Sequence, residues 1–262
     1  MLRVLEPIWL KKNETASRVR GRIENILDWA KVRRLRDGEN PARWSGHLDQ
    51  LLSAPSKVQK VKHHPALPYT EIGAFVARLR DRTSTPERGL EFAILTATRT
   101  NETLRATWSE FDLPASLWTV PAERMKANRD HRIPLSLAAV NLLRSLPTMG
   151  GTGVVFEGAK EGRPLSSMAF LQVLDRMERD DVTPHGFRST FRDWAAECTA
   201  FPSEVAEMAL AHAIRDKTES AYRRGDLFEK RRDLMQAWAD YIDTPPQPLA
   251  GAATDNQSVD RG

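Results

Sequence analysis

A short stretch near the C-terminal end of the sequence carries three polar signatures in order. His185 and Arg188 stand three residues apart in PHGFR, so a helix would present both side chains on one face. His212 ends the apolar run MALAH, and Tyr222 follows ten residues later beside two arginines. Arginines bind phosphoryl oxygens, imidazoles move protons and a phenol can act as a nucleophile, so these residue types suit phosphoryl transfer.

Two further cations lie upstream. Arg99 stands at a helix junction in TATRTNE, with Glu102 three residues later, and we expect Glu102 to orient Arg99 rather than to react. Lys126 lies in the polar turn MKANRDH, between two short extended runs. Arg124 and Lys160 are alternative loop cations.

The order Arg, Lys, His-x-x-Arg, His, Tyr resembles that of the tyrosine recombinases, the phage integrase family, over nearly the whole chain. A lone His-x-x-Arg occurs by chance in many helices, whereas six signatures in one order are specific. The subgroup that it resembles comprises integrases of prophages and genomic islands related to the satellite phage P4. The sequence segments that carry this likeness are ETASRVRGRIE, ENPARWSGHL, VKHHPALPY, WTVPAERMK, HRIPLS, TPHGFRSTFRDW and MQAWADYID.

The resemblance implies a site-specific DNA recombinase that cuts and rejoins strands through a 3′-phosphotyrosine intermediate, for integration or excision of a prophage or genomic island. This is chemistry of the type IB topoisomerase kind. Arg99 and Arg188 would stabilise the charge of the five-coordinate transition state through their forked donors. Because these cations replace the metal ions of other phosphoryl transfers, and no acidic cluster stands out in the sequence, we expect no metal and no cofactor.

The remaining roles follow from the same resemblance. Tyr222 would attack the phosphorus, and Lys126 would protonate the leaving 5′ oxygen. His185 would accept the tyrosine proton, and His212 would hydrogen-bond the phosphate, although a histidine that caps a carbonyl is an alternative for His212. The other tyrosines, Tyr69 at the linker and Tyr241 on the last helix, are interpreted as packing residues.

The elements that must position these residues are mostly helical. A stripe of Val19, Ile23, Ile26, Leu27 and Ala30 predicts a packed helix between residues 13 and 36, with a basic outer face. We also expect Trp9, Trp29 and Trp44 to lie in the core of this region. Further helices are predicted from residue 70, from residue 85 and from about 226 to 242, and the runs LWTVP and RIPLS predict a β-hairpin. Other helix starts are expected at Ser136, Ser166, Pro184, Ser203 and Thr218. The fold class is therefore mainly α with a small β-hairpin or sheet.

The domain organisation follows from composition and from the resemblance. We predict a partial helical core-binding domain over residues 1–53, a basic, proline-rich linker over 54–68 and the catalytic domain over 69–243. The Pro- and Gly-rich residues 244–262 are predicted to be a disordered tail.

Net charge and cysteine content indicate which partners and which cellular compartment to expect. Residues 1–62 hold 14 Lys and Arg against 7 Asp and Glu, a net charge of +7 that favours a polyanion such as DNA. The expected partners are double-stranded DNA at attachment core sites, a homo-tetramer in the synapse and DNA-bending accessory proteins. A single cysteine, no signal sequence and no long apolar run favour a cytoplasmic, nucleoid-associated protein and exclude a membrane protein.

The sequence departs from the family at its N-terminus. Members carry an arm-binding domain and a four-helix core-binding domain, whereas Met1 opens in what resembles the middle of the latter, so we expect an N-terminally truncated member. The alternative function is a DNA-binding remnant that occupies core sites without completing recombination. A relaxing activity like that of type IB topoisomerases is a more distant alternative.

Overall fold

The computed structural model describes residues 1–58, 65–212 and 225–244. The chain divides into two compact units, Met1–His63 and His64–Gly262, which are described separately. Within the described ranges, no helix has both the length and the apolar composition that crossing a bilayer requires.

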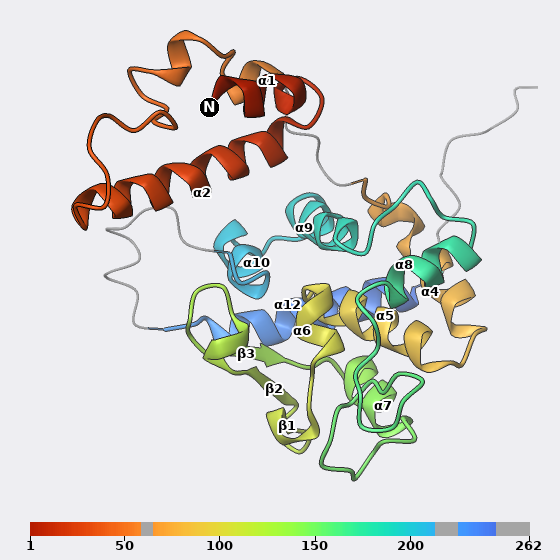
Figure 1. Ribbon diagram of the computed structural model, residues 1–262. Coiled ribbons are helices and arrows are strands. Elements are labelled where there is room, and N and C mark those ends of the chain that lie inside the picture. The colour runs from red at the N-terminus through yellow and green to blue at the C-terminus, as the bar shows by residue number, and fades with distance from the viewer. Residues whose placement is uncertain (59–64, 213–224, 245–262) are drawn as a thin grey trace, which may run out of the picture. The chain divides into compact units, whose positions relative to one another are not determined.

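The first unit is a small helical assembly (Figure 1). Its elements are α1 (Leu2–Trp9), α2 (Asn13–Val32), the 3₁₀ turn η1 (Leu48–Gln50) and α3 (Pro55–Val58). Leu5, Trp9, Ala16 and Leu48 form its core, and the ring of Trp9 stacks on that of Trp44 at 5.5 Å. The core placement expected for Trp9 is therefore confirmed.

The predicted apolar stripe of α2 is not buried as expected. The buried residues of α2 are Asn13 and Ala16, whereas the stripe residue Ile26 is 63% exposed. The core placement of Trp29 is wrong, because its side chain is 56% exposed and the Arg33 guanidinium lies over its ring at 5.5 Å. The reason is length, since α1 has 8 residues and α2 has 20, so α1 can cover only part of α2.

The second unit holds most of the helices. They are α4 (Ile72–Arg80), α5 (Thr85–Thr96), α6 (Thr100–Leu104), α7 (Leu137–Arg144), α8 (Ala169–Arg176), α9 (Gly186–Cys198), α10 (Ser203–Ala209) and α12 (Phe228–Asp243). Short 3₁₀ turns are η2 (Tyr69–Glu71), η3 (Trp108–Glu110) and η4 (Ala122–Arg124). The predicted starts at residues 70, 85, 136, 166, 184 and 203 each lie within three residues of one of these elements. The predicted start at Thr218 lies outside the described residues.

The core of this unit forms around α5 and α12. Helices α4, α7 and α8 pack on α5, and α12 packs on α4, α9 and α10 (Figure 1). Trp238 of α12 is fully buried, donates its indole N–H to the carbonyl oxygen of Ile94 at 2.9 Å and lies 4.9 Å from the Trp194 ring. A buried indole with a satisfied N–H fixes the register of α12 against α5.

A three-stranded antiparallel sheet completes the unit. Its strands are β1 (Phe111–Asp112), β2 (Leu117–Val120) and β3 (His131–Pro134), in the order β1-β2-β3. Trp118 pairs with Ile133, and both side chains are buried. The mainly α fold with a small hairpin or sheet is thus confirmed, with residues 121–130 as the connection between β2 and β3.

The segment that leads into the second unit packs on the start of α9. The Leu67 carbonyl oxygen accepts a hydrogen bond of 2.5 Å from Thr190, and the Pro65 carbonyl oxygen accepts one of 3.1 Å from the Thr183 amide. A Cβ at Gly186 would lie only 2.1 Å from the Pro65 oxygen, so this approach requires glycine. Residues 65–67 therefore belong to the packing of the second unit, while the predicted domain limits stay a prediction.

Candidate active site

Arg99 lies at the junction between α5 and α6. Helix α5 ends at Thr96, and the next residue, Ala97, has a left-handed backbone (φ 51°). This turn leads the chain into α6, whose N-cap residue is Arg99. The Arg99 Nη1 donates to Glu102 Oε1 at 2.7 Å, and the Arg99 amide donates to Glu102 Oε2 at 2.8 Å. Because Glu102 is buried and holds both groups, it orients Arg99 as the sequence predicts.

Arg188 is the third residue of α9 and is only 4% exposed. Its Nη1 donates to the Ala97 carbonyl oxygen, and its Nη2 donates to the Leu210 carbonyl oxygen at 2.6 Å. Burial, followed by the nearby charge of Arg99, lowers the pKa of Arg188 to about 10, so the guanidinium is still a cation at neutral pH.

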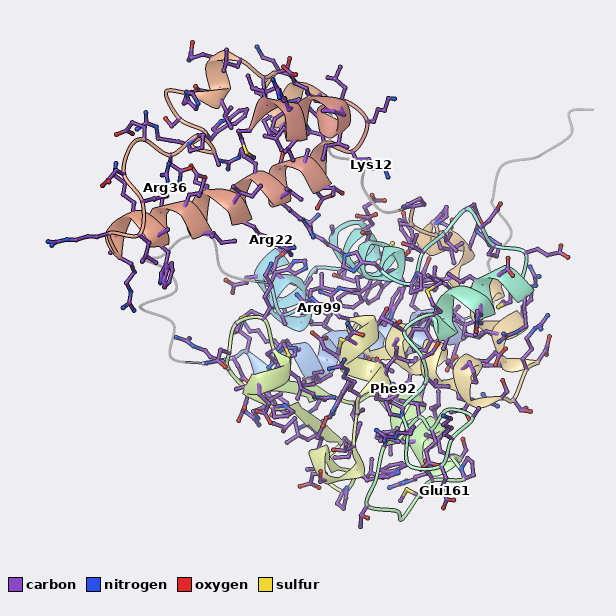
Figure 2. The ribbon with its side chains drawn as sticks, viewed as in Figure 1. Lys12, Arg22, Arg36, Phe92, Arg99 and Glu161 are labelled. Carbon is purple, nitrogen blue, oxygen red and sulfur yellow. The ribbon has the colours of Figure 1, made fainter. Side chains whose placement is uncertain are left out.

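The two guanidiniums meet at the turn that follows α10. Arg99, which is labelled in Figure 2, donates from Nη2 to the carbonyl oxygens of Leu210, at 3.5 Å, and of Ala211, at 3.2 Å. Arg99 and Arg188 therefore share the Leu210 oxygen, although the two arginines stand far apart in the sequence. The result is a concentration of positive charge beside a single backbone turn.

His212 lies at the same turn, between a carboxylate and a guanidinium. Its Nδ1 lies 2.6 Å from Glu207 Oε2, and its Nε2 lies 3.3 Å from Arg188 Nη2. Glu207 also accepts a hydrogen bond of 2.6 Å from Arg192 Nε. Burial raises the pKa of the Glu207 carboxyl, but the hydrogen bonds from Arg192 and His212 outweigh it, and the net pKa is lowered. Glu207 is therefore an anion beside the ring of His212.

The other predicted site residues lie on nearby or separate elements. His185 is exposed and immediately precedes α9, three residues before Arg188. Lys126 is exposed in the loop between β2 and β3. Tyr222 lies outside the described residues. The structure thus brings Arg99, Arg188 and His212 together, with His185 at the start of the helix that carries Arg188.

This geometry coincides with a family match. The model described as "Phage integrase family" matches residues 69–227, more than half of the chain. The chain belongs to the phage integrase family. A second model, "Phage integrase central domain", matches residues 1–47 of this integrase-family chain, within the first unit.

The curated relatives of this chain are integrases that resemble it in sequence but are longer. Prophage integrase IntA of Escherichia coli (strain K12) is 33% identical over 234 residues, which cover 87% of this chain and 54% of the relative. The integrase of Enterobacteria phage P4 is 29% identical over 253 residues, which cover 88% of this chain and 56% of the relative. The chain therefore spans about half the length of these relatives.

Solved structures of two integrases share the fold of this chain. A lambda integrase dimer bound to a COC′ core site has a TM-score of 0.55 at 15% identity, over 78% of this chain and 73% of that one. The integrase from mycobacterium phage Brujita has a TM-score of 0.51 at 19% identity, over 87% of this chain and 75% of that one. At these identities the likeness establishes the fold of this family member.

Two of the candidate loop cations differ in their exposure in the structure. Arg124 is largely buried, and its Nη2 donates to Glu110 Oε2 at 2.5 Å, so it is engaged within the protein. Lys126, two residues later, is exposed. Of these two cations, Lys126 is the one presented to solvent.

Sequence reasoning missed one buried cation of this chain, Arg231 on α12. Arg231 is 1% exposed, and it donates to the carbonyl oxygens of Asp226 at 2.7 Å and of Arg132 at 2.6 Å. It fixes α12 to β3 where the described chain resumes. Its spacing of three and four from Leu234 and Met235, which are buried on the same helix, is the signal that could have found it.

Sequence reasoning also missed Glu207, the partner of His212. Its spacing of five from His212 gave no helical signal, because the ring meets the carboxylate only after the chain turns at Ala211 (φ 48°). In the part of the chain that the structure describes, no group of three or more His, Cys, Asp or Glu side chains could hold a metal ion.

Proposed function

We propose that this chain is a tyrosine-type site-specific recombinase that cuts and rejoins DNA strands during integration or excision of a prophage or genomic island. The observation that carries the proposal is the convergence of Arg99, Arg188 and His212 on one turn. Both guanidiniums direct donors to the Leu210 oxygen, which is the kind of partner that a phosphoryl oxygen would replace. Family membership supports the same reaction class.

The proposed cleavage step transfers a phosphoryl group from the 5′ oxygen of DNA to Tyr222. The Tyr222 oxygen attacks phosphorus and forms the P–O bond of a 3′-phosphotyrosine, while the bond from phosphorus to the 5′ oxygen breaks. His185 takes the phenolic proton, and Lys126 gives a proton to the departing 5′ oxygen. Arg99, Arg188 and His212 stabilise the charge on the non-bridging oxygens. Attack by the 5′-hydroxyl of another strand reverses each step and rejoins the DNA without ATP.

The proposed partner is double-stranded DNA at an attachment core site. The lambda integrase with a similar fold is described as bound to a core site, and residues 1–62 of this chain carry a net charge of +7. A homo-tetrameric synapse, with accessory proteins that bend the DNA, would bring four reacting strands together. Such an enzyme would work in the cytoplasm, at the nucleoid.

Covalent trapping tests the proposal. The probe is a nicked duplex made from the sequence at the boundary of the DNA element that encodes the chain, so that the cleaved fragment diffuses away. We expect the full chain to form a protein–DNA adduct, Tyr222→Phe to bind equally but form none, and Tyr241→Phe to form it normally. An adduct with Tyr222→Phe that is lost in Tyr241→Phe would contradict the assignment.

A second candidate is a DNA-binding remnant that occupies core sites without completing recombination. The observation that favours it is the apolar surface of α2, where Ile26, Trp29 and Val32 are all more than half exposed. A remnant would bind the nicked duplex and leave no adduct. The trapping experiment therefore separates the two candidates.

A further inference from the structure

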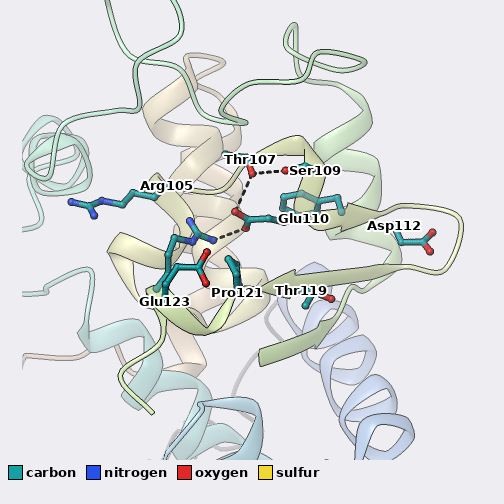
Figure 3. Close-up of a pocket in the computed structure, with 10 residues that line it drawn as sticks. Arg105, Thr107, Ser109, Glu110, Asp112, Thr119, Pro121 and Glu123 are labelled. Carbon is teal, nitrogen blue, oxygen red and sulfur yellow. Dashed lines mark hydrogen bonds and ion pairs between the residues drawn. The ribbon is translucent and has the colours of Figure 1, made fainter. Parts of the chain in front are cut away.

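A largely buried carboxylate outside the arginine cluster, that of Glu110, lines an open pocket of about 670 Å³ beside the sheet (Figure 3). Glu110 Oε2 accepts hydrogen bonds from Trp118 Nε1 at 2.8 Å and from Arg124 Nη2 at 2.5 Å. Its other oxygen accepts from Thr107 Oγ1 at 3.0 Å. Three donors hold Glu110, so its carboxylate is a fixed point for Arg124.

Arg124 also reaches the helix that holds the first site arginine. Its Nη1 donates to the backbone oxygen of Glu102 at 3.4 Å, and the side chain of Glu102 binds Arg99. One guanidinium therefore joins the Glu110 pocket to α6. A lysine could not do this, because a single ammonium lacks the planar fork that spans two acceptors.

The same arginine anchors the loop that carries Lys126. Arg124 stands two residues before Lys126, and Met125 between them is 8% exposed. At the neck of the loop, the Ala122 amide donates to Asp130 Oδ1 at 2.9 Å. The backbone is thus fixed on the side next to Lys126, while the Lys126 side chain is exposed.

We propose that Glu110 and Arg124 form a positioning pair that holds the loop of Lys126 at a fixed place relative to Arg99. The pair sets where the ammonium meets the leaving 5′ oxygen, and it touches neither DNA nor the reacting atoms. This inference rests on the proposed role of Lys126 as general acid. A displacement of about 1 Å in such a group can cost about 10²-fold in rate.

A substrate with sulfur in place of the bridging 5′ oxygen isolates this role. A thiol has an unperturbed pKa of about 8.5, whereas an alcohol, like water, is a far weaker acid, so a thiolate leaves without a proton. We expect Lys126→Ala to slow cleavage of the ordinary nicked duplex by about 10²- to 10⁴-fold and to cleave the sulfur duplex at nearly the normal rate.

Arg124→Lys and Glu110→Gln should show the same pattern. We expect the cleavage rate of the ordinary duplex to fall by about 10- to 100-fold, and that of the sulfur duplex to stay near normal. Both rates are measured on one protein preparation, so their ratio does not depend on the fraction that is folded. The matched control is Glu123→Gln, an exposed residue that lines the same pocket, which should leave both rates unchanged. Arg99→Lys should slow both substrates, because both carry the same non-bridging oxygens.

Two results would overturn the inference but leave the proposed function standing. In the first, Lys126→Ala recovers on sulfur but Arg124→Lys and Glu110→Gln are slowed equally on both substrates, which would make the pair structural only. In the second, both pair variants cleave both substrates normally. If Lys126→Ala itself does not recover on sulfur, the general-acid role fails and the inference fails with it.

Discussion

The Glu207 carboxylate lies 2.6 Å from one nitrogen of the His212 ring, while the Arg188 guanidinium lies 3.3 Å from the other. A guanidinium has no acceptor, so the nitrogen that faces it accepts, and the nitrogen that faces Glu207 carries the proton. A phosphate that takes the Arg188 donor would free that second nitrogen, and Glu207 would then stabilise an imidazolium that donates to the phosphate.

We therefore expect Glu207→Gln to slow cleavage by about tenfold, because a neutral amide stabilises the charged ring less than a carboxylate does. Single-turnover cleavage of the nicked duplex measures this, with DNA affinity measured in parallel. Glu229→Gln, on the exposed face of α12, serves as the matched control. A normal cleavage rate for Glu207→Gln would show that the contact is structural.

Arg188→Ala should affect both the chemistry and the fold. It removes a transition-state cation, for a loss of at least about 10³-fold in cleavage, and it leaves the Ala97 and Leu210 carbonyl oxygens without these donors. We expect the free energy of unfolding to fall by about 2–4 kcal/mol. Urea unfolding followed by tryptophan fluorescence measures it, and Tyr222→Phe should show no comparable loss. Unchanged stability would mean that water satisfies both carbonyls.

We expect the half-buried His131 on β3 to make the stability of the fold depend on pH. Burial, with a further contribution from the charge of Arg231, lowers the pKa of His131 to about 4. Below the unfolded pKa of about 6.5, the unfolded chain binds a proton that the folded chain does not, so stability falls as the pH drops from about 6.5 to about 4. The expected loss is on the order of 2–3 kcal/mol. Urea unfolding at several pH values should show a shallower loss in His131→Asn, and parallel curves would contradict the prediction.

Metal chelation should leave the chemistry intact. The proposed stabilising charges are the two guanidiniums and an imidazole, so adduct formation should proceed at the same rate in excess EDTA. The trapping assay with and without added Mg²⁺ measures this directly. A rate that falls with EDTA and recovers with Mg²⁺ would contradict the proposed step.

The basic side chains of the first unit should contribute to DNA affinity. Arg22 lies on α2, Lys12 immediately precedes this helix and Arg36 follows it (Figure 2). All three belong to the 14 Lys and Arg residues that give residues 1–62 their net charge of +7. If Arg22 contacts a phosphate, Arg22→Ala should reduce the slope of log affinity against log salt by about 0.9. Binding titrations at several salt concentrations measure the slope, and an unchanged slope would exclude that contact.

Much of the fold could be predicted from local patterns. Helix α4 and the β2–β3 hairpin follow from apolar periodicity and turn residues, which act over a few residues. The error at Trp29 has the opposite origin, because periodicity says which residues share a face and not whether another element covers it. The order of motifs indicated Arg99, Arg188 and His212, but the Leu210 carbonyl that the two arginines share lies 111 residues after Arg99. No local pattern contains that contact.

The glycine of PHGFR has a consequence for how force passes along the chain. Gly186 lets the Pro65 carbonyl come within a distance that a methyl group would block, and Thr183 and Thr190 hold residues 65–67 on both sides of it. Residues 65–67 are thus anchored to the first turn of α9, two residues from Arg188. Tension applied from the first unit would load the arginine-bearing turn before it reached the tryptophan core around α12.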